Sequence, residues 1–344
     1  MFRRKLWSIG PFHHGKSSTT FEGHKLRYAR ELLSQITPIG TNLLEECVAC
    51  VKTIEYEARK CYSEHINLSS DGFVEMMVID GLFIIELFRK KANISKIERD
   101  DPIFDTVSVL KLLRHDLVLL ENQLPMIFNG VSLNILALQF FHELLLPQVE
   151  EVVQKSLSGC EAKHLLDLLG KTFHNLPKLG NEKNNSWKSI PSATKLKRAG
   201  VRFVVGSTNG SFLDIKFKDG VMEIPPMMIK YETDMLMRNL IAYELSSVGK
   251  VTYYMTSYGF LMESLINSGE DVRILRKQGI LKNHLSSDEV GALLFKEFCR
   301  KVPIANFNYS ELCDQVNSYY ETPWHRRVWR ILRESLLACM WSKN

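Results

Sequence analysis

The segment 73–88 constrains the fold most strongly, because it is apolar around nearly its whole helical circumference. Charge enters it at Glu75, Asp80 and Glu86, which the helical period spreads around the axis. A helix with this pattern must be covered on all sides, so these carboxyl groups cannot all face water. We therefore expect a central helix in a large core, with Asp80 buried and hydrogen-bonded to another segment, because a buried carboxylate without a partner is costly.

The composition is that of an ordinary globular protein, with 344 residues, 45% hydrophobic and 24% charged. A net charge of +5 is too small to indicate a nucleic-acid partner. The seven cysteines are odd in number and scattered, which is typical of reduced thiols and favours a cytoplasmic location. We expect no integral membrane span, because no stretch approaches the roughly 18 apolar residues that one requires. The basic N-terminus also lacks the apolar region of a secretory signal.

Helical periodicity covers most of the chain, and strand-like alternation is confined to one stretch. Residues 200–205 and 212–217 alternate, and Asp219 with Gly220 predicts a hairpin turn into 221–225. The fold class is therefore mainly α, an α-helical globule with a small antiparallel β insert near 200–225. We divide the chain into a helical part (1–174), a polar linker (175–192) and a C-terminal part (193–344), which together form one integrated domain over 8–330. After a loop at 8–24, we expect helices from residue 25 and over 41–65, 73–88, 112–128, 133–146, 162–173, 234–246, 252–267, 271–278, 287–300, 310–320 and 325–340.

Residues 10–17 read GPFHHGKS and match the phosphate-loop pattern G-x-x-x-x-G-K-[ST]. That loop requires a buried strand before it and a helix that begins at the Lys. The short basic stretch before Gly10 offers no such strand, and the Ser/Thr-rich stretch after Ser17 is a poor helix start. We interpret the segment as a loop packed by Phe12 and expect no cofactor, with nucleotide binding as a minor alternative.

Cys47, Cys50, Cys61 and His65 superficially resemble a zinc site. The helical pattern runs without interruption from the first cysteine to the third, which would hold them roughly 21 Å apart. Zinc ligands must meet within a few ångströms, so we expect no metal. We interpret Cys47 and Cys50 as buried small apolar residues.

Two polar triplets, RHD at 114–116 and ENQ at 121–123, lie seven residues apart and would share one face of a helix over 112–128. One interpretation is a buried acid/base site with His14, Asp80 and Glu121 as weak catalytic candidates. The interpretation that we favour is a structural network that fixes helix register. Its members would be Asp80, Arg114, His115, Asp116, Glu121 and Asn122.

Several motifs in sequence order resemble the plant family called "domain of unknown function two-hundred-and-forty-seven". They are SIGPFHHG at 8–15, MMVIDGLFIIE at 76–86, DLVLLENQLP at 116–125, HLLD at 164–167, KLKRAGVRF at 195–203, LDIKF at 213–217, NLIAYE at 239–244, TSY at 256–258 and DVRIL at 271–275. The resemblance spans roughly residues 8–330. The Lys after the first motif varies in this family, so Lys16 and Ser17 look incidental.

The resemblance implies a function class that the periodicity does not. The family has no established catalytic activity, and members linked to the grass self-incompatibility loci act as pollen-side recognition determinants. Relatives usually end in an apolar, membrane-anchoring helix, and we expect no such helix in this chain.

We therefore predict a plant recognition protein with an unknown protein partner, either a pollen-side self-incompatibility determinant or a relative of one, with no catalysis and no nucleic-acid partner. An enzyme with a site around His14, Asp80 and Glu121 is the alternative. Recognition should lie on the loops at 175–192 and 206–211, because loops accept variation that a packed core cannot. Trp187 is the partner-binding candidate, since Trp is enriched at interface hot spots.

Overall fold

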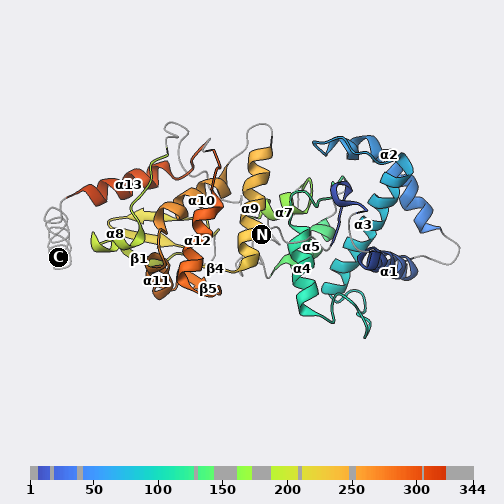
Figure 1. Cartoon of the computed structure of the whole chain (residues 1–344), viewed down its shortest axis with the longest axis horizontal. Helices are drawn as coiled ribbons and strands as arrows, with labels where there is room; N and C mark the ends of the chain where they lie inside the picture. The colour runs from blue at the N-terminus through green and yellow to red at the C-terminus, as the bar shows by residue number, and fades with distance from the viewer. Residues whose placement is uncertain are drawn as a thin grey trace, which may run out of the picture. The chain divides into compact units, whose positions relative to one another are not determined.

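The computed structural model describes residues 7–15, 19–36, 42–127, 131–142, 161–172, 187–207, 211–247, 253–303 and 306–322. The chain forms two compact units (Figure 1). The first comprises Met1–Asn175 and Met235–Ser246, and the second comprises Leu176–Asp234 and Ser247–Asn344. The return of Met235–Ser246 to the first unit has no counterpart in the sequence-based division at 175–192. The expected helix over 325–340 lies outside the described residues.

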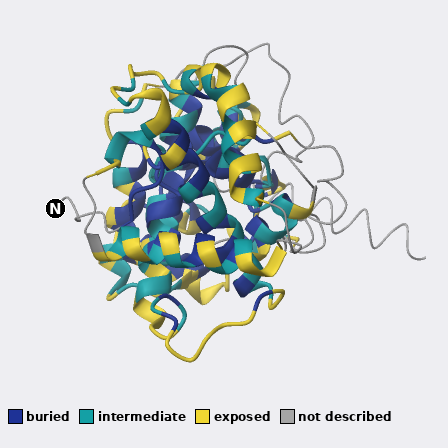
Figure 2. Ribbon diagram, turned by 90° about the vertical axis from the view of Figure 1, so that its right-hand side faces the viewer, coloured by how far each residue is buried: buried dark blue, intermediate teal, exposed yellow. Residues whose placement is uncertain are grey.

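The first unit is organised around helix α3 (Ser70–Lys91), against which α1 (Thr19–Ile36), α2 (Leu43–Lys60) and α5 (Val131–Phe141) pack. Buried residues lie on all sides of α3, and they include the polar Asp80 and Glu86. Figure 2 shows the buried residues gathered inside the unit that faces the viewer, with exposed residues on its outer turns. The expected central helix is confirmed. The unit also contains a short 3-10 helix η1 (Pro11–His13), α4 (Val107–Leu117) and α7 (Leu165–Lys171).

Two boundaries in the first unit differ from the sequence-based expectation. Helix α1 already begins at Thr19, where we expected a loop to residue 24. Helix α4 begins earlier than expected, at Val107, and ends at Leu117 rather than near Pro125. The amide of Gln123 donates to the carbonyls of Leu117 and Leu119 (both 2.8 Å), so a side chain takes over acceptors that a continuing helix would use.

The second unit holds both sheets. Its first sheet has the strand order β1-β3-β2, formed by β1 (Arg202–Val205), β2 (Lys216–Lys218) and β3 (Val221–Ile224). Strands β2 and β3 pair antiparallel through Asp219 and Gly220, both at positive φ (49° and 76°) as a type I′ turn requires. The predicted hairpin is confirmed.

The β content is not wholly antiparallel, which corrects the expectation for this insert. Strand β1 pairs parallel with β3, and β4 (Met227–Ile229) pairs parallel with β5 (Leu281–Asn283). Parallel partners are joined by long connections, so neither pairing leaves a local turn signal in the sequence.

Helices surround these sheets in the second unit. Helix α9 (Tyr231–Ser246) begins in this unit, and its later part is counted in the first. In the described ranges of the whole chain, no helix has the length and apolarity needed to cross a bilayer. The other helices are α8 (Ala193–Arg198), α10 (Tyr254–Leu265), α11 (Gly269–Lys277), α12 (Asp288–Phe298) and α13 (Ser310–Glu321).

Candidate functional site

The N-terminal loop is bound to the first unit by side chains that accept its backbone N–H groups. Trp7 N–H donates to Asp116 Oδ2 (3.0 Å), and Ile9 N–H donates to Asn122 Oδ1 (2.7 Å). Gly10 N–H donates to Asp80 Oδ2 (2.8 Å). Residues 7–10 have no strand or helix to satisfy these donors, so the side chains replace a ladder. We call Trp7, Ile9, Gly10, Asp80, Asp116 and Asn122 the loop network.

Gly10 adopts a backbone conformation that only glycine adopts easily, with φ at 74°. A Cβ at this position would lie 2.6 Å from the carbonyl oxygen of Gln123. The loop therefore passes too close to the segment after α4 for any larger residue.

Asp80 is buried and holds two partners at once. Besides Gly10, its carboxylate contacts the Lys25 ammonium, with Oδ1 at 2.8 Å from Nζ. Lys25 is itself buried, and its second anion is Glu22 at 3.1 Å. Burial raises the pKa of the Asp80 carboxyl, while Lys25 and the Gly10 N–H act in the opposite direction.

Two amide side chains shape the segment that follows α4. Asn122 Nδ2 donates to the carbonyls of Trp7 (3.1 Å) and Asp116 (2.8 Å), so Asn122 both donates to and accepts from the N-terminal loop. Gln123 Oε1 accepts from Leu166 N–H (3.0 Å) at the start of α7. Asp116 and Asn122 therefore lie close together, as we expected. They do so through the Asn122 amide rather than by sharing one face of a continuous helix.

The other candidates of the expected network take separate places. Arg114 is buried, with its guanidinium carbon 5.3 Å from the centre of the Phe140 ring. His115 Nδ1 lies 3.3 Å from Asp116 Oδ1. Glu121 is half exposed, with 56% of its side chain accessible, and lies 3.7 Å from His13 Nε2. The backbone donor to Asp80 comes from the expected 10–15 loop, whereas Arg114 and His115 are not among the donors that the structure places on it.

The three weak catalytic candidates differ sharply in their surroundings. His14 is exposed beside η1, and Glu121 is exposed with His13 as its neighbour. Asp80, in contrast, is buried against Lys25 and Gly10. No contact that the structure records joins any two of the three.

A second buried charge cluster was missed by the sequence reasoning. Lys90 Nζ, which is fully buried, lies 2.7 Å from Asp101 Oδ2 and 2.6 Å from Glu31 Oε2. It also lies 4.0 Å from the centre of the Tyr28 ring, whose hydroxyl donates to Asp101 Oδ1 (2.7 Å).

At Asp101, hydrogen bonds from neighbouring groups together affect the pKa more than burial does. Burial raises the pKa of the Asp101 carboxyl, but hydrogen bonds from Lys90, Tyr28 and two backbone N–H groups hold that pKa below its ordinary value. The signal that could have revealed Lys25 was its place in the sequence, because it shares the buried face of α1 with Tyr28, Ala29 and Leu32 at helical spacing. The burial of Lys90 was harder to predict, because a cation near the end of an apolar helix usually lies in solvent.

The cysteines of α2 correct one expectation. Cys50 is exposed and Cys47 half-buried, so they are not the buried pair that we expected. Helix α2 continues to Lys60, and Cys61 is exposed just beyond it. Among the residues that the structure describes, no group of three His, Cys, Asp or Glu side chains could hold a metal ion.

The phosphate-loop segment is only partly described, because Lys16 and Ser17 lie outside the described residues. The helix that we did not expect after this segment does begin, at Thr19. Residues 7–10, however, form no strand, and the Gly10 N–H is occupied by the Asp80 carboxylate. The described residues thus show neither the preceding strand nor the helix beginning at the Lys that a phosphate loop requires.

Trp187 lies in the second unit at the described end of the expected linker. Its ring packs 5.9 Å from that of Phe260, yet 38% of the residue is exposed. Most of the 175–192 linker and the tip of the 206–211 turn lie outside the described residues.

Comparison with known proteins agrees with the motif resemblance. The model of the family DUF247, described as "Plant protein of unknown function", matches residues 2–343, and the chain belongs to this plant family. It is similar to the UPF0481 protein At3g47200 of Arabidopsis thaliana, at 29% identity over 99% of this chain and 78% of that protein. It is also similar to the putative UPF0481 protein At3g02645 of the same plant, at 24% identity over 94% of this chain and 80% of that protein. No solved structure matches the chain.

Proposed function

We propose that this chain is a protein-interaction protein that recognises a protein partner in plants and catalyses no reaction. The observation that carries the proposal is Trp187, which packs on Phe260 while 38% of it stays exposed. An indole supported from behind and open to solvent is a suitable interface anchor, because little side-chain freedom is lost when a partner covers it.

The loop network also supports the proposal, because its polar side chains are used by the fold. Asp80, Asp116 and Asn122 accept hydrogen bonds from the chain's own backbone, so their polar groups already serve the fold. The enzyme alternative requires His14, Asp80 and Glu121 to act on one substrate. Two of these are exposed and the third is buried in an ion pair, which gives that alternative little support.

Two finer proposals accompany this one. A cytoplasmic location is supported by thiols that form no disulfide, such as Cys47, Cys50 and Cys313. A pollen-side role in self-incompatibility, which the family resemblance implies for some members, predicts that the protein is present in pollen. Comparing its abundance in pollen and in leaf tests that role, and equal or greater abundance in leaf would speak against it.

The test of the main proposal is affinity purification of the tagged full chain from the native tissue, quantified by mass spectrometry. Trp187→Ala should reduce recovery of the specific partner by about tenfold or more, as expected for a hot-spot aromatic residue. Tyr231→Ala is the matched control, because Tyr231 is also aromatic, lies in the same unit and is 65% exposed. Equal recovery with both variants, or a turnover activity that depends on His14 or Glu121, would contradict the proposal.

A further inference from the structure

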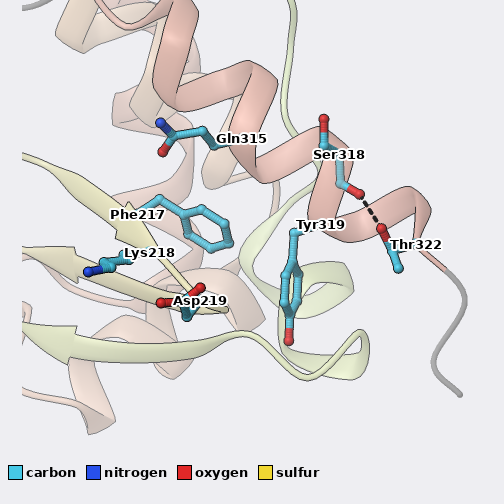
Figure 3. Close-up of a pocket in the computed structure, with 7 residues that line it drawn as sticks. All are labelled: Phe217, Lys218, Asp219, Gln315, Ser318, Tyr319 and Thr322. Carbon is cyan, nitrogen blue, oxygen red and sulfur yellow. Dashed lines mark hydrogen bonds between the residues drawn. The ribbon is translucent and has the colours of Figure 1, made fainter. Parts of the chain in front are cut away.

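A pocket of about 470 Å³ opens between the β2–β3 hairpin and α13, within the second unit. Figure 3 shows the side chains that line it. This volume lies in the range of about 300–1,000 Å³ that is typical of small-molecule sites. The hairpin contributes Phe217, Lys218 and Asp219, and α13 contributes Gln315, Ser318, Tyr319 and Thr322.

Two aromatic rings from distant segments form one wall of the pocket. The rings of Phe217 and Tyr319 meet edge to face, with 5.6 Å between their centres. Tyr319 packs closely on the hairpin, because a Cβ on Gly220 would collide with its ring and hydroxyl. A Cβ on Gly200, at the end of α8, would lie 3.9 Å from the same hydroxyl. The fold therefore holds the aromatic wall in place before any ligand arrives.

Helix α13 presents the opposite, polar side of the pocket. Its inner face is anchored by buried residues such as Leu312 and Val316. The lining residues follow helical spacing from Gln315 to Thr322, so they extend about 10 Å along one side of the helix. A ligand of one or two small rings can therefore contact the whole row.

The polar groups of the lining are mainly hydrogen-bond acceptors. The Thr322 hydroxyl donates to the Ser318 carbonyl (2.7 Å), which leaves its oxygen to accept from a ligand. The Asp219 carboxylate can only accept, and it makes no hydrogen bond or ion pair with another described residue. Gln315 Nε2 lies 3.5 Å from Glu311 Oε1, so most of the bonding capacity of its amide is available. A fitting ligand must therefore donate several hydrogen bonds, as hydroxyl groups do.

The charge of the pocket favours a neutral ligand. The burial of β2 alternates, so Lys218 lies on the sheet face opposite to Phe217, and Figure 3 shows its side chain extending away from both rings. Asp219 is the one acidic residue of the lining, and it is exposed, where water and salt screen its charge. A cation would gain little from one screened carboxylate, whereas a neutral ligand loses little when it leaves water.

We propose that this pocket is a binding site for a neutral saccharide. One face of a sugar ring consists of C–H groups, which suit the negative face of an aromatic ring such as Tyr319. Its hydroxyl groups can donate to Asp219, Gln315 and Thr322, and the bond to the carboxylate is the strongest of these. A purely aromatic ligand fits less well, because it would displace water from these acceptors without replacing the hydrogen bonds. This inference goes beyond the proposed protein interaction and does not rest on it.

The direct probes are the methyl glycosides of glucose, galactose, mannose, xylose and arabinose, each added to the full chain at about 10 mM. Saturation-transfer difference NMR should detect at least one of them, with the strongest transfer to the C–H groups of one ring face. The expected Kd is about 0.1–10 mM, because so small a ligand makes few contacts in an open pocket. Absence of transfer to every probe would overturn the proposal.

Three variants test whether the sugar binds in this pocket. Asp219→Gly suits the positive φ of the turn and removes the carboxylate, so it should weaken binding by about tenfold. Ser318→Trp places an indole in the pocket from an exposed position and should abolish the NMR signal. The matched control Tyr320→Trp places its indole about 200° around α13 from Ser318 and should leave binding unchanged. Equal loss with the control, or full binding by both test variants, would overturn the proposal.

Competitors of other chemistry test the ligand class. Tetramethylammonium and phenol, at the same concentration as the sugar, should leave its saturation transfer unchanged. Displacement of the sugar by either compound, with tighter binding than every glycoside, would assign the pocket to a cation or to an aromatic group. That result would overturn the proposal.

The saccharide can be a free molecule or part of a glycosylated partner, and competition separates these sources. Displacement of the native partner by the glycoside that binds best would support a sugar on the partner. A partner that stays bound while the glycoside fills the pocket would support a free saccharide. The NMR signal should also persist in Trp187→Ala, so the proposed function can fail while this inference stands, and the reverse.

Discussion

The two units use cations in opposite ways. In the first unit, Lys25 and Lys90 are buried, and each contacts two carboxylates. In the second, Arg198 and Arg202 are exposed and make no ion pair with a described residue. A buried charge must be paired to repay its desolvation, whereas an exposed charge costs the fold little and stays available. The position of a cation, rather than its type, thus separates structural charge from charge that can serve recognition.

The strongest way to break this comparison is to remove Lys90. Lys90→Met should lower the free energy of unfolding by about 3–5 kcal/mol, because Asp101 and Glu31 would lose their buried cation. Denaturant unfolding of the full chain measures the loss. The control Lys96→Met, at an exposed position, should change stability by less than about 0.5 kcal/mol. Equal effects of the two variants would show that burial does not separate the two kinds of cation.

Asp80→Asn should have a smaller effect, about 1–3 kcal/mol of unfolding free energy. The variant still offers an acceptor to Gly10 N–H, and Lys25 keeps Glu22 as an anion. The double variant Asp80→Asn/Lys25→Met should lose less unfolding free energy than the sum of the two single losses. Lys25→Met removes the buried charge that Asp80→Asn leaves without its carboxylate. Strict additivity in the double variant would contradict the ion pair between these residues.

How far the sequence predicts this network is clear from Asp80. An apolar helix with one carboxyl group in its middle implies burial and a partner, and the structure has both. The sequence does not show that the partner is Lys25, because the pairing joins residues 55 positions apart on two helices. The Asp116–Asn122 contact was expected for a wrong reason, since α4 ends at Leu117.

The pH dependence of stability sharpens the comparison of buried carboxylates. Asp271 of α11 is buried, and although burial raises its pKa, hydrogen bonds from Thr194, Ser268 and Asn267 hold it below the ordinary value. Burial raises the pKa of Glu86, despite Ser95 and Arg89. Asp271 therefore contributes stability that is present above its unfolded-state pKa of about 4 and is lost as pH falls through the lower folded-state pKa. Glu86 has the opposite sign, because the folded state binds its proton more tightly and gains stability as pH falls.

Comparing Asp271→Asn and Glu86→Gln with the unmodified chain in acid measures these signs. As pH falls below about 5, the difference in unfolding free energy should shrink for Asp271→Asn. For Glu86→Gln, the unfolding free energy of the unmodified chain should rise relative to that of the variant over the same pH range. If this difference in unfolding free energy changed with pH in the same direction for both variants, the assigned pKa directions would be contradicted.

The smallest effect on stability is expected at the exposed cations. Arg198→Ala/Arg202→Ala should change the unfolding free energy by less than about 0.5 kcal/mol, because neither residue has a charged partner to lose among the described residues. Thermal unfolding monitored by circular dichroism checks this. A loss above about 2 kcal/mol would mean that these cations serve the fold, and the contrast between the units would fail.

The long-range contacts of the second unit were less predictable than its β2–β3 hairpin. Asp219 and Gly220 specify their turn locally, so two residues were enough to predict the β2–β3 pairing. The contact of Tyr319 with Gly200 and Gly220 joins positions about a hundred residues apart, and the parallel β1–β3 pairing likewise has no local signal. Local turn chemistry can be read from a sequence, whereas surfaces assembled from distant segments require the fold.

The most direct test of the account is the affinity of the native partner for two variants, measured by calorimetry below both melting temperatures. Trp187→Ala should leave the melting temperature of the chain nearly unchanged and weaken partner binding by about tenfold or more. Asp80→Asn should lower the melting temperature and leave the affinity unchanged, because its partners lie inside the first unit. Unchanged affinity with Trp187→Ala, together with lost affinity in folded Asp80→Asn, would contradict the account and place recognition at the buried network.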